Sequence, residues 1–403
     1  MPGMDRHGWN VLGFTLLFQG ASFGILIYSF ALFVVPWLET FGASRGQTMM
    51  AVAGLQLGIG WASPFVGRAL DAFSARWIVI SGALLIAVGL WMLARTTALW
   101  QVILIYATLL PVGLAMTGPL AAQTLVARWF VRRRGMAVGI SAIGTSLGGF
   151  MIPVVTGLLI TTIGWRATLD WLSLGLLLAI VPGAFWILKR PPPERAVVSP
   201  AAGDGTADPE REWPLSEILR APAFRVTILA MLPINIAFGG VQFNIGAYAQ
   251  DLGFGPERAA LVISAIALAM IGGKFCFGAL ADRVDHRLLH SAAALGMLLG
   301  LLLVVGQPGY GRLLMAAACI GAAAGGILPL ISVIVASRFA ASAFGRVMGM
   351  MTLFITLAAF GSLLAGALRD LLGSYDGVFL GFAILLLPTL VVIRRLPPAS
   401  VAW

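Results

Sequence analysis

Lys274 lies inside an apolar stretch that is long enough to cross a membrane. It belongs to the run 271–278 and precedes, by eight residues, Asp282, where the stretch ends. At 1.5 Å per helical residue this places Lys274 about 12 Å from the end, near the middle of a hydrocarbon layer of about 30 Å. A charge at that depth is costly unless it faces a cavity or a counter-ion. The position of Lys274 therefore predicts that its charged side chain binds an anion.

Two other roles for Lys274 are less favourable. Its depth disfavours snorkelling of the ammonium group to the interface. Pairing with an embedded carboxylate is disfavoured because the predicted helices carry no Asp or Glu near the middle. The acidic residues in or next to these helices lie near their outer ends; they are Asp170, Asp251, Asp370 and Asp376. The other lysine, Lys189, lies at an interface. A single embedded positive charge favours a monoanion over a dianion.

Other polar residues at similar depth are weaker candidates for substrate binding. Tyr28 follows Gly20 and Gly24 at helical spacing, on a face where the backbones of two helices can approach closely, and core packing is its alternative role. The remaining candidates are Thr117, Asn235, Gln242, Thr352 and Thr356. For any single one of these, a hydrogen bond to a neighbouring helix is the simpler interpretation.

The composition requires a membrane-embedded scaffold for these residues. Of 403 residues, 60% are hydrophobic and only 10% are charged, whereas about a quarter of the residues in soluble domains are charged. This excludes soluble globular, disordered, collagen-like and nucleic-acid-binding proteins. The first apolar run, from Trp9 to Trp37, is too long for the core of a signal peptide. The chain is predicted to lie in a lipid bilayer.

Charged residues and Gly/Pro breaks divide the chain into twelve apolar runs, each near the roughly 20 residues that a transmembrane helix needs. We expect these helices at 10–38, 46–67, 77–97, 99–127, 135–160, 165–188, 224–249, 259–281, 286–306, 310–337, 346–368 and 375–393. The predicted fold class is an all-α integral membrane protein with twelve transmembrane helices.

One long polar stretch, from Lys189 to Arg225, separates the sixth run from the seventh. Its Pro-rich, acidic beginning is typical of a flexible linker, and residues 213–220 are typical of a short interfacial helix. We expect an N-terminal six-helix bundle over 1–189, a cytoplasmic linker over 190–223 and a C-terminal six-helix bundle over 224–403.

The distribution of basic residues predicts the orientation in the membrane. Most of the 26 lysines and arginines fall on the same side as the N-terminus, and cytoplasmic loops carry the excess of such residues. Both termini are therefore expected in the cytoplasm. The high ratio of arginine to lysine and the absence of long tails favour a bacterial plasma membrane.

The two halves of the sequence repeat each other at a nearly constant separation. The matching landmarks are Gly42 with Gly253, the segments 67–71 with 278–282, Pro119 with Pro329, and Gly135 and Gly139 with Gly345 and Gly349. Two bundles related by an axis along the membrane normal form a rocker-switch transporter, which binds its substrate at their interface near the midplane. We expect two pseudo-symmetric bundles of this kind.

The segments 67–76 and 278–287 resemble the signature loops of the major facilitator superfamily, and the resemblance covers essentially the whole chain. Asp71 and Asp282 can pair with arginines and a helix N-terminus on the cytoplasmic side, and these pairs must break when that side opens. The gate assigned on this basis comprises Asp71, Arg76, Asp282, Arg283, Arg132 and Arg346. Capping of a tight turn is the alternative role of the two aspartates, and Ala72 stands where the family often has a basic residue.

A narrower resemblance involves the segment 127–148, which is similar to the helix 4–5 signature of the monocarboxylate transporters and the related oxalate–formate antiporters. The residues 28–30 and 41–45 are similar to the first helix and loop of that group. The resemblance implies that a basic residue, usually arginine, binds the substrate carboxylate at the place of Lys274, with a tyrosine at the place of Tyr28. Lysine lacks the bidentate contact of arginine.

No constellation for enzymatic chemistry or for a cofactor is predicted. The segment 144–148 has the letters of a nucleophile elbow but lies in a predicted helix, where that strand–turn–helix motif does not occur. The histidines His7, His286 and His290 lie near membrane boundaries without metal-ligand spacing. The two cysteines are expected to be buried small hydrophobic residues.

The predicted function is secondary transport of a small organic monoanion such as lactate or pyruvate by a rocker-switch cycle. A proton is expected to be co-transported, because Lys274 is the strongest candidate at depth for a change of protonation. The alternatives are an obligatory organic-anion exchanger and an exporter of neutral or amphiphilic compounds, including drugs. A transport-inactive sensor and a membrane enzyme fit the sequence less well.

Overall fold

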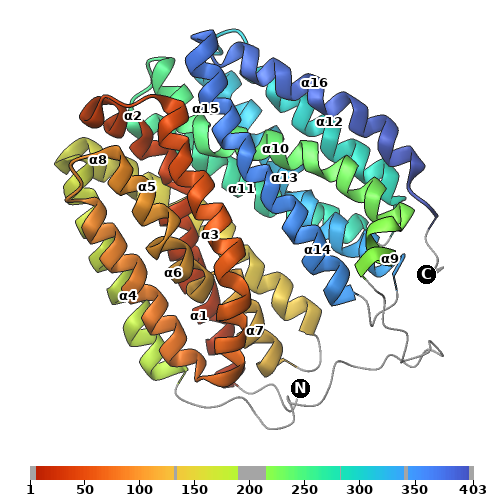
Figure 1. Cartoon of the computed structure of the whole chain (residues 1–403), viewed down its shortest axis with the longest axis horizontal. Helices are drawn as coiled ribbons and strands as arrows, with labels where there is room; N and C mark the ends of the chain where they lie inside the picture. Colours follow the sequence, from red (N-terminus) through yellow and green to blue (C-terminus); the bar gives the residue numbers. More distant parts are fainter. Residues whose placement is uncertain (1–5, 131–133, 189–214, 282, 340–343, 399–403) are drawn as a thin grey trace. The chain divides into compact units, whose positions relative to one another are not determined.

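The structure of the protein is a computed structural model that describes residues 6–130, 134–188, 215–281, 283–339 and 344–398 (Figure 1). Over these ranges the regular elements are all helices. Eleven helical stretches among the described residues are long and apolar enough to cross a membrane. The predicted all-α membrane architecture is therefore confirmed.

The described residues of the first half of the chain form eight α-helices and one π-helical turn. These are α1 (Arg6–Phe23), the turn Gly24–Tyr28, α2 (Phe30–Phe41), α3 (Arg45–Ala72), α4 (Ala75–Leu93), α5 (Leu99–Ala107), α6 (Leu109–Thr117), α7 (Pro119–Trp129) and α8 (Arg134–Ile187). The predicted run 10–38 corresponds to α1, the turn and α2 together, and the run 99–127 corresponds to α5, α6 and α7.

The helix α8 contains two membrane crossings. Its 54 residues would extend about 80 Å as one helix, far more than a hydrocarbon layer of about 30 Å. The backbone leaves the helical region at Gly164, with φ 78° and ψ 164°, a conformation that glycine adopts readily. The resulting helices, 134–163 and 165–187, match the predicted runs 135–160 and 165–188. With this break the eleven stretches account for the twelve predicted helices.

The second half of the chain begins with the short helix α9 (Leu215–Arg220), within the segment where an interfacial helix is predicted. The helices that follow are α10 (Pro222–Asp251), α11 (Pro256–Leu280), α12 (His286–Val304), α13 (Tyr310–Ala336), α14 (Phe344–Thr356), α15 (Phe360–Leu372) and α16 (Asp376–Val392). A 3₁₀ turn, Leu357–Ala359, joins α14 to α15. Figure 1 shows α12 beside α16, with which it packs.

The internal repeat is visible in the local backbone. Gly42 and Gly253 both adopt a left-handed conformation, with φ 60° and φ 84°, between the end of one helix and the start of the next. The two matching prolines behave differently. Pro119 begins α7, after Gly118 leaves the helical region, whereas Pro329 lies inside the continuous helix α13. Proline disfavours the helical conformation of the residue that precedes it. At Gly118 the backbone adopts an extended conformation instead, and the helix is interrupted before Pro119.

Glycines and buried hydroxyl groups hold α1 against α8. Gly148 approaches the backbone of Gly20, and Gly144 approaches that of Leu16, whereas Gly139 has no neighbour within 4 Å of an added Cβ. Along the same seam the hydroxyls of Thr15 and Ser141 lie 3.0 Å apart. Small residues and polar pairs are the usual means of joining helices in a membrane.

The chain divides into two compact units. Unit 1 comprises residues 1–201 and 245–264, and unit 2 comprises 202–244 and 265–403. The units differ from the predicted sequence halves mainly in the segment 245–264, which groups with unit 1. The close approach of Gly246 to Ala31 and of Gly157 to Ala260 accounts for this grouping.

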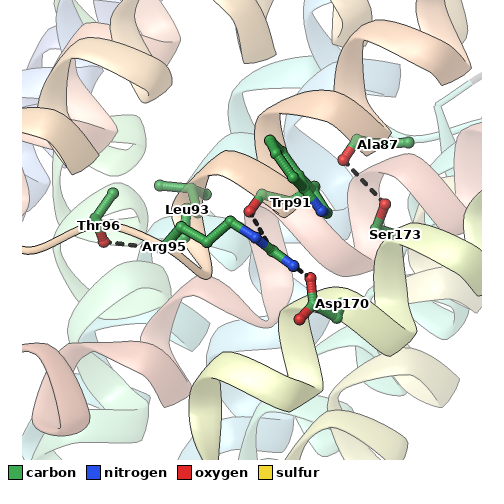
Figure 2. Close-up of polar contacts among 7 residues, drawn as sticks. All are labelled: Ala87, Trp91, Leu93, Arg95, Thr96, Asp170 and Ser173. Carbon is green, nitrogen blue, oxygen red and sulfur yellow. Dashed lines mark hydrogen bonds and ion pairs between the residues drawn. The ribbon is translucent and has the colours of Figure 1, made fainter.

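Within unit 1, a polar joint links α4 to α8 (Figure 2). Arg95 donates hydrogen bonds to the Trp91 carbonyl and to Asp170, each 2.7 Å long, and its guanidinium lies 4.2 Å from the centroid of the Trp91 ring. The Ser173 hydroxyl donates to the Ala87 carbonyl at 2.9 Å. Asp170, in the second turn of the helix 165–187, is thus paired with Arg95.

Candidate functional site

Lys274 lies in α11 where this helix packs tightly on α13. A Cβ added to Gly325 of α13 would lie 2.9 Å from the backbone nitrogen of Lys274, and Gly273 approaches Ala322 of the same helix. The Lys274 side chain is half-buried. Because α11 ends at Leu280, Lys274 lies about 9 Å from the helix end, somewhat less than the 12 Å predicted. The lysine is still inside the apolar stretch, as the sequence predicts.

Tyr28 lies at the end of the π-helical turn and faces α8. A Cβ added to Gly149 would lie 2.6 Å from ring atoms of Tyr28, so only glycine leaves room for the ring. The side chain is 4% exposed and shares a hydrogen bond with the side chain of Ser146. The turn is stabilised by Ser29, whose backbone nitrogen and hydroxyl both donate to the Gly24 carbonyl, at 2.9 and 2.8 Å. Such π-helical turns occur frequently at functional sites.

Thr117 and Asn235 make hydrogen bonds within the protein. The Thr117 hydroxyl accepts a hydrogen bond from Ser22 of α1 and donates one to the Gly113 carbonyl, both at 2.9 Å. The bond to Ser22 is the kind of interhelical hydrogen bond that the sequence favours for this residue. The Asn235 side chain donates to the Met231 carbonyl of its own helix at 2.8 Å. Thr356 is half-buried at the end of α14, and the side chain of Thr352 lies outside the described residues.

Gln242 differs from the other candidates because its buried amide lacks hydrogen bonds. The side chain is 3% exposed, and among the described residues neither its nitrogen nor its oxygen has a hydrogen-bond partner. Asn244 lies two residues after Gln242 in α10, about 200° around the helix axis. Its amide forms hydrogen bonds with Tyr375 and with two backbone carbonyls. Leaving a buried polar group without a partner costs about 1–3 kcal/mol. A bound polar molecule would remove this cost at Gln242.

The structure describes only part of the predicted cytoplasmic gate. Asp282 and Arg132 lie outside the described residues, as do the side chains of Asp71 and Arg346. The guanidinium of Arg76 lies over the rings of Trp77 and Phe185, at 5.1 and 5.8 Å from their centroids. The side chain of Arg283 is exposed. The pairing of these arginines with the two aspartates stays a prediction.

A polar cluster that the sequence analysis missed ties down the end of the chain in unit 2. Arg287 donates to the Leu396 carbonyl, and Arg338 donates to the Pro397 carbonyl at 2.9 Å and to the His286 ring at 3.0 Å. Burial lowers the pKa of Arg338, as does the nearby charge of Arg287, while Asp285 opposes the shift. From the sequence, Arg338 was used only for the orientation of the chain and Arg287 also as the last residue of the segment 278–287. Their bonds to distant carbonyls leave no signal in the sequence.

Arg45 and Asp251 also acquire a role that the sequence did not reveal. Their side chains form an ion pair within unit 1, and the Arg45 side chain is only 5% exposed. The sequence placed both residues at the outer boundary without pairing them. The unfavourable position of each charge could have indicated that the two residues need partners. Arg45 begins α3 and Asp251 ends α10, and the helix dipole disfavours a positive charge at the start and a negative charge at the end of a helix.

Comparison with known proteins identifies the family. The sequence model described as Major Facilitator Superfamily matches residues 12–310 and 243–402. The chain belongs to this superfamily. It is a transport protein rather than an enzyme, and it crosses the membrane several times, as predicted.

The sequence relatives place the chain among proteins like the monocarboxylate transporters. It is 30% identical to mouse monocarboxylate transporter 11 over 94% of this chain and 85% of the relative. It is 27% identical to bovine monocarboxylate transporter 13 over 98% of this chain and 91% of the relative. These relatives are mammalian, so they give no support to the expected bacterial origin.

Solved structures support the fold. The nucleoside transporter NupG matches with a TM-score of 0.77 at 12% identity, over 97% of this chain and 100% of that chain. A bacterial homologue of the lysosomal transporter Spinster, in an inward-facing and occupied conformation, matches with a TM-score of 0.68 at 14% identity, over 98% of this chain and 95% of that chain.

Proposed function

We propose that this superfamily member transports a small organic monoanion, such as lactate or pyruvate, and that Lys274 binds the carboxylate. The observation that carries the proposal is the position of a lysine inside the apolar helix α11. A cation in a membrane span is costly and usually marks a substrate or ion pathway. The names of the mammalian relatives support a monocarboxylate as the anion.

Gln242 is the second residue that we assign to the substrate. Its buried amide offers one acceptor and two donors that none of the described residues uses. A 2-hydroxy or 2-oxo group beside the carboxylate could meet them. Thr117 and Asn235 are weaker candidates, because hydrogen bonds within the protein already engage them. Tyr28, Thr352 and Thr356 stay proposals from the sequence.

Transport is proposed to follow a rocker-switch cycle in the plasma membrane, with both termini in the cytoplasm. Arg76 and Arg283, together with Arg132 and Arg346, would pair with Asp71 and Asp282 when the cytoplasmic side is closed. This arrangement would alternate the access of Lys274 between the two sides of the membrane.

Uptake into proteoliposomes tests the substrate class. Labelled L-lactate should enter saturably, and unlabelled pyruvate should compete with it. Lactamide, which replaces the carboxylate by a neutral amide, and oxalate, which carries two charges, should compete at least tenfold more weakly. Equal competition by lactamide would contradict a carboxylate-binding lysine and would favour the exporter of neutral compounds.

Proton coupling is proposed to involve Lys274. If the empty site holds a neutral lysine, a proton and a carboxylate bind together, and each raises the affinity for the other. Vesicles without internal substrate should then accumulate lactate under an inward proton gradient and make the medium alkaline. Uptake that requires preloaded carboxylate at every pH would instead indicate obligatory exchange.

A second titratable residue serves as the control for this assignment. His290 in α12 is fully buried, and neither ring nitrogen has a hydrogen-bond partner in the part of the chain that the structure describes. His290→Gln should leave uptake dependent on the proton gradient. Loss of that dependence in His290→Gln, with uptake by exchange retained, would move the coupling site from Lys274 to His290.

A further inference from the structure

One end of unit 1 is closed by contacts between residues from distant parts of the sequence. We call it the distal end; it contains Arg45, Gly164, Asp251 and Glu257. In the predicted orientation it faces away from the cytoplasm. At this end Arg45 of α3 pairs with Asp251 of α10, and the Thr161 hydroxyl donates to Glu257 of α11 at 3.2 Å.

The backbones near these polar contacts also approach closely. A Cβ added to Gly246 of α10 would lie 2.9 Å from the Ala31 carbonyl oxygen and 3.0 Å from its Cβ. A Cβ added to Gly157 of α8 would lie 2.9 Å from the Cβ of Ala260 and 3.0 Å from the Pro256 carbonyl oxygen. At Gly246 and Gly157, a larger residue would therefore prevent this closure.

The charges of the ion pair are placed against the local preference of each helix. Arg45 is the first residue of α3, where a positive charge is disfavoured, and Asp251 is the last residue of α10, where a negative charge is disfavoured. Neither charge therefore stabilises its own helix end. The ion pair between Arg45 and Asp251 compensates both charges, and it exists only while α3 and α10 are together.

We propose that Arg45 and Asp251, supported by Thr161 and Glu257, form a clamp that closes the distal end and breaks when this end opens to load or release substrate. The proposal rests on the alternating-access cycle proposed above. It adds the second gate of that cycle, opposite the predicted cytoplasmic one, and assigns specific positioning residues to it. The transported molecule does not touch these residues in this account.

Chemical labelling of a buried cysteine tests the clamp without any substrate. Ser264 of α11 lies one turn after Ala260. It is 2% exposed, and its hydroxyl has no hydrogen-bond partner within the described ranges. Cys276 is exposed and Cys319 is half-buried, so the prediction that both cysteines are buried is wrong and both must first be replaced. Ser264→Cys in a chain that lacks these two cysteines then reports opening with little disturbance. The reagent is a water-soluble maleimide, applied to the full chain in lipid nanodiscs, where it reaches both faces of the membrane.

Asp251→Asn and Arg45→Gln should each raise the labelling rate of Ser264→Cys at least about threefold, because the clamp is lost. The double variant Arg45→Asp/Asp251→Arg should return the rate to that of the parent, because it restores the pair and also suits both helix ends. The matched control is Asp170→Asn, which removes the ion pair between α4 and α8 and should leave the rate unchanged. An unchanged rate in Asp251→Asn, an equal rise in Asp170→Asn, or no recovery in the double variant would overturn the proposal.

A wedge at the close backbone contact gives an independent test. Gly246→Leu leaves all charges in place but should keep the distal end open, so labelling should again be faster. If Gly246→Leu labels as slowly as the parent, the contact with Ala31 does not close this end and the proposal is wrong. Labelling needs no substrate, so failure of the clamp and failure of the monocarboxylate assignment are separate results.

Discussion

Tyr375 and Asn244 form a closed hydrogen-bonded pair in the core of unit 2. The Tyr375 hydroxyl donates to Asn244 Oδ1 at 2.9 Å, and Asn244 Nδ2 donates to the Gly240 and Ser362 carbonyls at 2.9 and 3.3 Å. Every strong polar group of this pair is used. Gln242, on the opposite side of the same helix, has both amide atoms unused.

This contrast predicts opposite effects of two similar substitutions. Asn244→Leu leaves the Tyr375 hydroxyl without its acceptor and should lower the free energy of unfolding by about 1–3 kcal/mol. Gln242→Leu removes no hydrogen bond of the protein and should leave the stability unchanged or slightly raised. Thermal unfolding of both variants in detergent measures the difference.

The same pair separates structural from functional polar residues. Gln242→Leu should raise the KM for lactate uptake several-fold, because the substrate loses a hydrogen-bonding partner. The folded fraction of Asn244→Leu should keep the KM of the parent. A stability loss in Gln242→Leu equal to that in Asn244→Leu, with an unchanged KM, would show that Gln242 is a structural residue.

Tyr28 permits a similar separation with Ser146 as the control. The hydrogen bond between them is lost in both Tyr28→Phe and Ser146→Ala, so its structural effect is common to the two variants. If the tyrosine hydroxyl also contacts the carboxylate, only Tyr28→Phe should raise the KM for lactate, by about tenfold or less. Equal kinetics in the two variants would restrict Tyr28 to packing between the π-helical turn and α8.

The arginine cluster in unit 2 predicts how the C-terminal segment is held. Arg338→Gln removes hydrogen bonds to Pro397 and His286 and should release the segment that contains Arg394 and Arg395. Trypsin should then cleave after these arginines several times faster than in the parent, as followed by mass spectrometry. Arg312→Gln, which affects only carbonyls of residues 302 and 305, is the control and should cleave at the parental rate.

The sequence predicted the helices well because long apolar runs and their breaks are local features. The sharp connection at Gly164 illustrates this, since the runs 135–160 and 165–188 already separated there. The position of Lys274 inside a helix followed from the same pattern. Its distance from the helix end was predicted less accurately, because α11 ends at Leu280 rather than at the charged residue that follows.

The side-chain partners could not be predicted, because they depend on which helices pack together. The π-helical turn directs Tyr28 onto Gly149, a contact that no spacing in the first helix specifies. Arg45 and Asp251 were recognised only as boundary charges, although they form an ion pair. Gln242 and Asn244 have similar side chains in one helix, and only their surroundings distinguish them.

Binding of a carboxylate by Lys274 is tested most directly by the uptake of labelled L-lactate in matched variants. Lys274→Met keeps the length of the side chain without its charge, and Lys274→Arg keeps the charge. Proteoliposomes with equal amounts of folded protein, checked by thermal unfolding, should show saturable uptake in the parent and measurable uptake in Lys274→Arg. Lys274→Met should lose at least 100-fold in kcat/KM, because the anion would enter an apolar site without a counter-charge. Uptake by Lys274→Met with the KM and kcat of the parent would contradict the account.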